Sequence, residues 1–398
     1  MMDKMATHPY ELVKHFPGKL ADELVEIISK PGLADWDKLL PSSELLAVYP
    51  RLLPSDHVLL IGCHHGALAV FIARHLPVGQ LSITDNNSIA LEMTRKTLVA
   101  NNISNVNLYP DANLPGTERK KYNTVFIQIP KGRKLCRRWL LQAYQVLIPG
   151  GNVYIAGSKH AGIQSSIKDA MELFGNGRIM AYKKGNHLSH LVKQLEVSSL
   201  PDWAYSPGIT PGTWVEFSVS ISNHCYQIHS LPGVFSFDHL DEGTKILLST
   251  INIHAGCKVL DVGCGFGMVG VFAATHGASW VDLIDNDLLA IASCTETLSI
   301  NQINNTSVFL SDLLDHVYAN KYDLILSNPP FHTGHAVDYQ IAEAIIRQSF
   351  QALNPGGQLC IVANRFIPYD RLINGIFGNV LCLAESGRFH VLSGIKSG

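Results

Sequence analysis

The sequence repeats itself at an offset of about 200 residues, so the chain must adopt a fold that can be built twice. Four segments match in the same order: residues 58–66 with 259–267, 84–87 with 284–287, 121–123 with 321–323, and 147–151 with 353–357. A run that contains Pro201, Pro207, Gly208, Pro211 and Gly212 separates the copies. We therefore predict a first domain over residues 1–200, a linker and entry strand over 201–230, and a second domain over 231–398.

Within each copy, short apolar runs alternate with segments of helical length. Residues 290–300, for example, separate the apolar run that begins at Val281 from the run that begins at Val308. This alternation is typical of an α/β fold, in which helices wrap a mostly parallel sheet. The last two apolar runs, residues 380–384 and 388–392, flank a turn sequence and predict a hairpin that closes the sheet.

The formal net charge of −2 conceals opposite charges on the two halves. Residues 1–200 hold 23 Lys and Arg against 16 Asp and Glu, whereas residues 201–398 hold 8 against 17. A basic half joined to an acidic half indicates that one half binds a polyanion while the other has another task. The candidate phosphate contacts are Lys131, Arg133, Lys134, Arg137, Arg138, Lys183 and Lys184. A solvated helix face is the alternative for each basic cluster.

Composition narrows the class of protein further. Of the residues, 46% are hydrophobic and 16% charged, as in an ordinary globular chain, and no apolar run is long enough to cross a membrane. The first residues lack the features of a signal peptide, so we expect a cytoplasmic protein. The eight cysteines are scattered without zinc-ligand spacing and predict reduced thiols and no metal site.

The second copy carries a glycine-rich loop, Asp261-Val262-Gly263-Cys264-Gly265-Phe266-Gly267, between a predicted strand and a predicted helix. Glycines at every second position allow a sharp turn and a close approach of the backbone to a ligand. The glycine pattern alone is weak evidence, because Gly270 also completes a dinucleotide-type spacing from Gly265. In the first copy, Leu60 replaces Asp261 and His64 replaces Gly265, which predicts that this copy has lost its ligand.

Carboxylates around this loop indicate the type of ligand. Asp261 would repel a pyrophosphate but would favour an ammonium or sulfonium compound. Asp285 ends the next strand and is placed to accept hydrogen bonds from ribose hydroxyls, and Asp312 follows the third strand, where it can accept from an adenine amino group. Together the three carboxylates describe S-adenosylmethionine, with NAD as the weaker alternative. A helix N-cap is the alternative role for Asp312.

The segment Asn328-Pro329-Pro330-Phe331 follows the apolar run 322–326, which is typical of a buried strand. Two prolines end the strand and force a rigid extended loop, at the edge of the sheet where α/β proteins bind ligands. The loop offers a side-chain amide, a rigid backbone carbonyl and an aromatic face, a combination suited to a planar amine.

These two loops resemble those of the class I methyltransferases that modify amino nitrogens. Residues 231–236 (LPGVFS), 240–241, 361–369 (IVANRFIPY) and 387–389 (GRF) are more narrowly similar to the RsmC/RlmG family of bacterial ribosomal RNA guanine-N2 methyltransferases, with the RsmC branch favoured. The family usually has an arginine and a glycine where this chain has Phe237 and His239. The resemblance is specific over residues 231–398 and looser before them.

The resemblance implies two tandem Rossmann-like methyltransferase domains, each with a seven-stranded sheet, of which the first is degenerate and docks RNA. It implies methyl transfer from S-adenosylmethionine to guanine N2 in 16S ribosomal RNA, within the small subunit or an assembly intermediate, by a monomer. The expected catalytic residues are Asn328, Pro329, Pro330 and Phe331. The expected cofactor-binding residues are Asp261, Gly263, Cys264, Gly265, Gly267, Asp285, Asn286, Asp312, Asp241 and Thr244.

The reactive loop has a chemical rationale that does not depend on the resemblance. The lone pair of the guanine 2-amino group is delocalised into the ring, so it must be oriented before it attacks a sulfonium methyl. The Asn328 side-chain oxygen and the Pro329 carbonyl are suited to accept its two N–H bonds, and Phe331 to stack on the base. The alternatives are guanine N2 in 23S RNA, adenine N6, a protein glutamine, or a non-catalytic RNA-binding factor.

Overall fold

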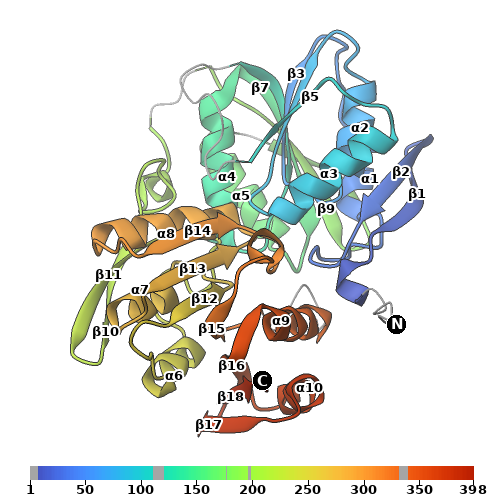
Figure 1. Cartoon of the computed structure of the whole chain (residues 1–398). Helices are drawn as coiled ribbons and strands as arrows, with labels where there is room; N and C mark the ends of the chain where they lie inside the picture. The colour runs from blue at the N-terminus through green and yellow to red at the C-terminus, as the bar shows by residue number, and fades with distance from the viewer. Residues whose placement is uncertain (1–7, 111–120, 176, 196–198, 331–338) are drawn as a thin grey trace. The chain divides into compact units, whose positions relative to one another are not determined.

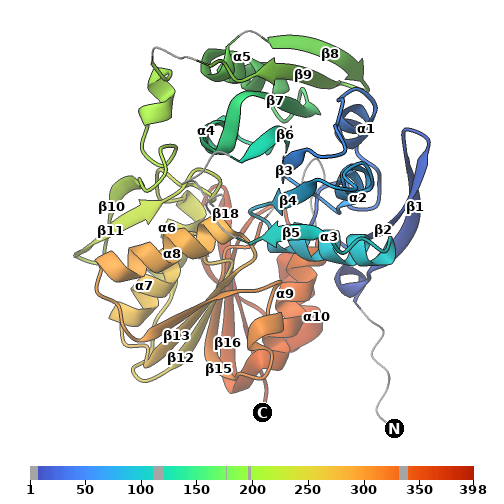
Figure 2. The same cartoon turned by 90° about the horizontal axis from the view of Figure 1, so that it is seen from above.

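The computed structural model describes residues 8–110, 121–175, 177–195, 199–330 and 339–398. The chain forms two units, which are described separately below (Figures 1 and 2). One unit is Glu11–Trp214; the other is Val215–Gly398 together with Met1–Tyr10. The change of unit at Trp214 falls inside the predicted linker, but residues 8–10 belong with the second copy rather than with the first.

The N-terminal unit contains helices on both faces of a sheet. In Figures 1 and 2, α1, α2 and α3 cover one face and α4 and α5 the other. Its helices are α1 Pro41–Val48, α2 Ala67–Arg74, α3 Ser88–Ala100, α4 Arg133–Val146 and α5 Ile163–Phe174. Its strands are β1 Lys14–Leu20, β2 Glu23–Ser29, β3 His57–Ile61, β4 Gln80–Thr84, β5 Val106–Tyr109, β6 Tyr122–Gln128, β7 Leu147–Ser158, β8 Gly177–Lys183 and β9 Asn186–Val192.

The C-terminal unit repeats this arrangement, with α6, α7 and α8 on one face and α9 and α10 on the other (Figures 1 and 2). Its helices are α6 Glu242–Thr250, α7 Met268–Thr275, α8 Leu288–Ile300, α9 Tyr339–Ala352 and α10 Tyr369–Phe377. Its strands are β10 Val215–Ile221, β11 His224–Ser230, β12 Lys258–Val262, β13 Trp280–Asp285, β14 Thr306–Leu310, β15 Tyr322–Ser327, β16 Leu353–Asn364, β17 Leu381–Glu385 and β18 Phe389–Ile395.

Each unit has a seven-stranded sheet, and the strand orders correspond one to one. The orders are β5-β4-β3-β6-β7-β9-β8 and β14-β13-β12-β15-β16-β18-β17. The first five strands of each sheet are parallel, and the last two form an antiparallel hairpin, as predicted for the chain end. The order of strands reverses between β3 and β6 in one sheet and between β12 and β15 in the other. Open α/β sheets bind ligands at such a point of reversal.

Each unit also begins with a hairpin, β1–β2 or β10–β11, that sequence analysis did not predict as a pair of strands. An asparagine at the equivalent position of each unit attaches its hairpin to a helix. Asn101 at the end of α3 donates to Glu26 O at 2.7 Å, and Asn301 at the end of α8 donates to Gln227 O at 2.6 Å. This shared hydrogen bond, about 200 positions apart, extends the duplication beyond the four matching segments.

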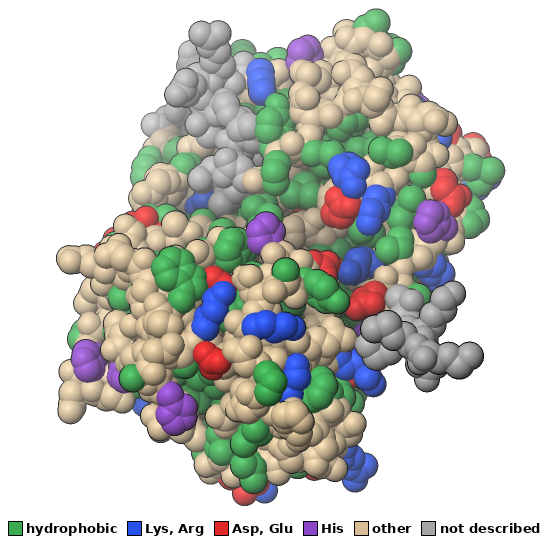
Figure 3. Space-filling view, viewed as in Figure 1, with side chains coloured by type: hydrophobic (Ala, Val, Ile, Leu, Met, Phe, Trp, Pro, Cys, Tyr) green, Lys and Arg blue, Asp and Glu red, His purple; other side chains and the backbone are tan. Residues whose placement is uncertain are grey.

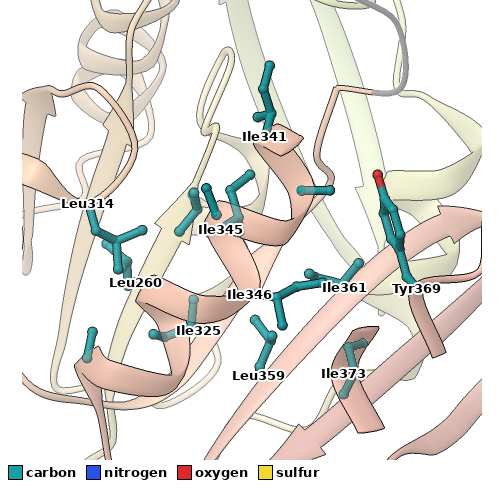
Figure 4. Close-up of a cluster of buried hydrophobic side chains, with 14 of the residues drawn as sticks. Leu260, Leu314, Ile325, Ile341, Ile345, Ile346, Leu359, Ile361, Tyr369 and Ile373 are labelled. Carbon is teal, nitrogen blue, oxygen red and sulfur yellow. The ribbon is translucent and has the colours of Figure 1, made fainter. Parts of the chain in front are cut away.

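Apolar residues from β12, β15 and β16 meet those of α9 and α10 in the core of the C-terminal unit. Figure 4 shows Leu260, Ile325, Leu359 and Ile361 on the strands facing Ile345 and its helical neighbours. Burial of these side chains stabilises the unit at roughly 25 cal/mol per Å² of apolar surface removed from water. The core fixes the strand ends that carry the candidate site.

Among the described residues, none of the helices is both long and apolar enough to span a bilayer.

The Asn301 hydrogen bonds give a first prediction. Asn301→Ala removes the bond to Gln227 O and the bond that Asn301 Oδ1 accepts from Gln227 N, so the β10–β11 hairpin should open more easily, by about 1 kcal/mol. Hydrogen exchange of the β11 amides measures this. The control is Asn304→Ala, which removes a hydrogen bond to Gln302 O within its own turn; equal exchange in both variants contradicts the prediction.

Candidate active site

The glycine-rich loop joins β12 to α7, as predicted, and turns through residues with positive φ. Gly265 has φ 55° and its amide donates to Asp285 Oδ2 at 3.0 Å. A β-carbon added to Gly263 meets no described atom within 4 Å, so this part of the loop faces open space among the described residues. A loop with a bare backbone beside open space suits a ligand that packs closely against it.

The two acidic residues expected beside this loop both accept hydrogen bonds from backbone amides. Asp261 is 2% exposed, and its Oδ2 accepts from the Gly270 amide in α7 at 3.0 Å. The pKa of the Asp261 carboxyl is raised to about 7, because burial and, to a smaller extent, the charge of Asp285 outweigh the Gly270 hydrogen bond, which lowers it. Burial also raises the pKa of Asp285, which the amides of Gly265 and Asp287 oppose. A nearby cation would favour ionisation of both carboxyls.

Asn328 lies directly after β15, as predicted, and its amide group is held in one orientation. The nitrogen donates to Thr244 Oγ1 at 2.9 Å and to Asp241 Oδ2 at 3.2 Å. Asp241 is the N-cap of α6 and also accepts from the Thr244 amide at 3.1 Å. The Asn328 Oδ1 atom is buried and has no hydrogen-bond partner among the described residues. A buried acceptor without a donor is costly, which marks it as a position for a ligand N–H.

Asp241 and Thr244 were expected to bind the cofactor, and in the structure both side chains accept a hydrogen bond from the Asn328 amide. Asp285, Asn286 and Asp312 lie at the ends of β13 and β14, as expected, and Cys264 is a buried free thiol. Asp312 is the N-cap of none of the described helices, because Leu314 takes that place before the next 3-10 helix. Pro329 is buried and Pro330 exposed. Phe331 lies outside the described residues.

The equivalent position in the N-terminal unit is filled by the protein itself. Gln128, at the place of Asn328, donates to Ser43 Oγ at 2.8 Å and Ser42 Oγ at 3.1 Å. A β-carbon on Gly62 would lie 2.5 Å from the Gln128 carbonyl and 3.1 Å from the Trp139 ring, where Gly263 faces open space. His64 keeps the left-handed conformation of Gly265, with φ 52°, and its ring nitrogen bonds Ala34 O at 2.6 Å.

The basic cluster of the N-terminal unit is only partly exposed. Arg133 and Arg137 both bind the buried carboxylate of Asp169, at 2.7 and 2.8 Å. Arg138 is 2% exposed and donates to Gly208 O at 2.7 Å, so its assignment as a phosphate contact is corrected to a structural role. Lys183 pairs with Glu44, and Lys131, Lys134, Lys183 and Lys184 all have exposed side chains. On the face in Figure 3, Lys and Arg side chains lie among Asp and Glu side chains.

All eight cysteines are free thiols. The part of the chain that the structure describes contains no group of three or more His, Cys, Asp or Glu side chains able to hold a metal ion.

The duplicated sheet order and the loops at its strand ends define a tandem methyltransferase. The family model "Methyltransferase small domain" matches twice, over residues 24–188 and 225–393. The chain belongs to the family of ribosomal RNA small subunit methyltransferase C, which confirms the predicted fold class, enzyme class and family branch.

Individual relatives support this membership. The Psychromonas ingrahamii "Ribosomal RNA small subunit methyltransferase C" is 36% identical over 275 residues, 69% of this chain and 76% of that protein. The Pseudomonas entomophila protein of the same name is 33% identical over 277 residues, 69% of this chain and 80% of that protein. A solved structure of the T. Thermophilus 16S rRNA N2 G1207 methyltransferase (RsmC), in complex with AdoMet and guanosine, has a TM-score of 0.79 and 24% identity. The similarity covers 98% of this chain and 99% of that one.

The raised pKa of Asp261 predicts how stability depends on pH. The neutral carboxyl is favoured in the folded protein, so its stabilising contribution is complete below the pKa of an unfolded aspartate and is lost as the pH rises through about 7. Asp261→Asn should remove this pH dependence, which approaches about 1.4 kcal/mol per pH unit within that window. Denaturant unfolding of the ligand-free protein from pH 4 to 8 measures the difference; parallel curves for both proteins would contradict it.

Proposed function

We propose that the C-terminal unit transfers a methyl group from S-adenosylmethionine to the exocyclic N2 of a guanosine in 16S ribosomal RNA. The observation that carries this proposal is the orientation of the Asn328 amide. Its nitrogen donates to Thr244 and Asp241, and its buried oxygen has no hydrogen-bond donor among the described residues. A guanine 2-amino group supplies such a donor. The enzyme acts in the cytoplasm, on the small subunit or an assembly intermediate.

The residues of the C-terminal unit fit the proposed cofactor. The open space beside Gly263 and the positive φ of Gly265 provide a close-fitting backbone, and the Asp261 and Asp285 carboxyls suit a ligand with a positive charge and hydroxyl donors. When bound, S-adenosylmethionine supplies an electrophilic methyl group on a sulfonium. Asp285 would hold the ribose hydroxyls, and Asp312 the adenine amino group.

Asn328 performs the positioning step of the reaction. Its oxygen accepts one N–H of the target amino group, and the Pro329 carbonyl accepts the other, which turns the nitrogen lone pair toward the methyl group. The amino group becomes acidic only as its bond to the methyl forms, so the surplus proton leaves to water without a strong side-chain base. Thr244 and Asp241 prevent the amide from rotating, because a rotated oxygen would face the Asp241 carboxylate.

The N-terminal unit acts as an RNA-docking domain that holds no cofactor. Its counterpart of the ligand space is occupied by the Gln128 carbonyl and the Trp139 ring. Burial lowers the pKa of His65 to about 3, so this histidine adds no positive charge to the loop near neutral pH. Phosphate binding falls to the exposed lysines, which neutralise backbone charge without reading sequence.

The direct test is a transfer assay with radiolabelled S-adenosylmethionine and unmodified small subunits, large subunits or naked RNAs. Labelled N2-methylguanosine in 16S RNA is the expected product. Label on adenine, on 23S RNA or on protein would overturn the proposed substrate, and tight cofactor binding without transfer would favour a non-catalytic RNA-binding factor.

Within that assay, Asn328→Ala should lower kcat by about 10²–10³-fold, because the target amino group is deprived of its positioned acceptor. Affinity for S-adenosylmethionine should be unchanged, which calorimetry measures. Gln128→Ala, at the same place in the N-terminal unit, is the matched control and should leave kcat intact. Wild-type turnover by the Asn328→Ala protein would refute the assigned role.

The exposed lysines give a further prediction. Replacing Lys131 and Lys134 together by Ala should weaken RNA binding and reduce the slope of log K against log salt by about 1 for each phosphate that is no longer neutralised. Filter binding from 50 to 300 mM salt measures this slope. The control removes two other exposed charges of the same unit, Lys19 and Lys38, which pair with Asp22 and Asp35. An unchanged slope in the Lys131/Lys134 protein, or an equal change in both, would count against the assignment.

A further inference from the structure

The N-terminal segment of the chain contributes a side chain to the candidate cofactor site of the C-terminal unit. Tyr10, in the 3-10 helix Pro9–Glu11, donates its hydroxyl proton to Asp312 Oδ1 at 2.5 Å. The two residues are 302 positions apart. This distance falls in the range of hydrogen bonds from a hydroxyl to an ionised carboxylate, which are about twice as strong as neutral ones.

The Tyr10 ring is part of the core of the C-terminal unit and not a loosely placed surface group. Tyr10 is 2% exposed and belongs to the buried cluster that includes Leu314 and Ile341, both labelled in Figure 4. Leu314 follows Asp312 in the loop after β14, and Ile341 lies in the first turn of α9. The ring therefore holds the hydroxyl at a fixed place beside the Asp312 carboxylate.

A second contact anchors the same segment. His8 Nε2 lies 3.6 Å from Glu343 Oε2 on α9, and His8 Nδ1 accepts from the Tyr10 amide at 3.2 Å. The segment is thus held at both the loop after β14 and α9. These contacts explain why residues 8–10 belong with the C-terminal unit, although the N-terminal unit follows them directly in sequence.

We propose that Tyr10 is a positioning residue for the adenine ring of the cofactor, acting through Asp312. The Tyr10 hydroxyl fixes the rotation of the Asp312 carboxylate, so that the carboxylate accepts the adenine 6-amino group without first being ordered. A carboxylate has about four acceptor positions, so it can accept from Tyr10 and from a ligand together. Binding of the adenine ring then costs less free energy, because the Asp312 side chain is already ordered and correctly oriented.

This inference rests on the proposed function, because it takes Asp312 to be the acceptor for adenine. Two ligands that differ at the 6-amino group test the role of Tyr10 separately from the proposed function. S-adenosylhomocysteine carries the 6-amino donor, and S-inosylhomocysteine has a carbonyl oxygen in its place. Calorimetry with the full-length wild-type protein, Tyr10→Phe and Asp312→Asn gives the affinity of each protein for each ligand.

The wild-type protein should prefer the adenosyl ligand. Tyr10→Phe should weaken adenosyl binding about 5- to 10-fold and change inosyl binding less than about twofold, since the inosyl ligand lacks the donor that Asp312 accepts. Asp312→Asn should abolish the preference. In turnover, Tyr10→Phe should raise KM for S-adenosylmethionine while kcat stays constant. Tyr318→Phe, which removes an exposed hydroxyl from the same unit, is the control and should match wild type in every measurement.

Three results overturn the proposal. Equal weakening of both ligands by Tyr10→Phe would assign the hydroxyl a structural role alone, and tighter adenosyl binding would mean that Tyr10 competes with adenine for Asp312. Unchanged adenosyl binding would show that the hydroxyl has no role. The phenyl ring keeps the core filled, and Asp312→Asn tests the acceptor independently of Tyr10. If the wild-type protein binds neither ligand, the proposed function fails as well. If the wild-type protein binds normally and Tyr10→Phe is unaffected, only the role of Tyr10 fails.

Discussion

The orientation of the Asn328 amide is the constraint on which the candidate active site depends. The two ends of an asparagine side chain are nearly the same size, so only hydrogen bonds decide which one faces a ligand. Here a carboxylate acceptor, Asp241, and the Thr244 hydroxyl bind the nitrogen, and the oxygen is left without a partner among the described residues. The two partners come from the start of α6, about 85 residues before Asn328 in sequence, and the sheet brings them together because β15 lies beside β16, against which α6 packs.

Much of this arrangement was predictable from the sequence because the relevant signals are local. The strand that ends at Ser327, the glycine turn after β12 and the closing hairpin all follow from apolar periodicity, glycine spacing and proline, which act over a few residues. The repeat presents each of these signals twice. The hairpins β1–β2 and β10–β11 were missed because β10 follows a proline- and glycine-rich run that is typical of a linker, and their attachment depends on Asn101 and Asn301 from distant helices.

The contacts that sequence reasoning did not supply are those set by tertiary packing. A tyrosine at position 10 gives no local sign that it will reach Asp312, and five basic residues near Trp139 give no sign that one arginine is buried. Arg138 and the Asp169 pairs show that a basic cluster can stabilise its own unit. Burial lowers the pKa of Arg138 to about 10, the expected direction for a cation withdrawn from water. Counting charged residues showed which half of the sequence is basic, but it could not show which of those residues are buried and which are exposed.

The two copies keep the same fold but differ beside the turn that follows the first sheet strand. Both loops keep the same turn: Gly62 and Gly263 donate to the strand beside them, and His64 holds the positive φ that Gly265 holds in the other unit. A side chain in this conformation costs about 1 kcal/mol or more, so the turn persists because the strand-to-helix connection requires it.

What differs between the two units is the space beside the turn. An empty site without a ligand would leave unfilled volume, and in the N-terminal unit the Trp139 ring and the Gln128 carbonyl fill it. The Ser42 and Ser43 hydroxyls accept hydrogen bonds from the Gln128 side-chain nitrogen. Under the proposed function, a charge near the closed site no longer affects a cofactor, so the N-terminal unit can carry the basic residues that the acidic C-terminal unit lacks.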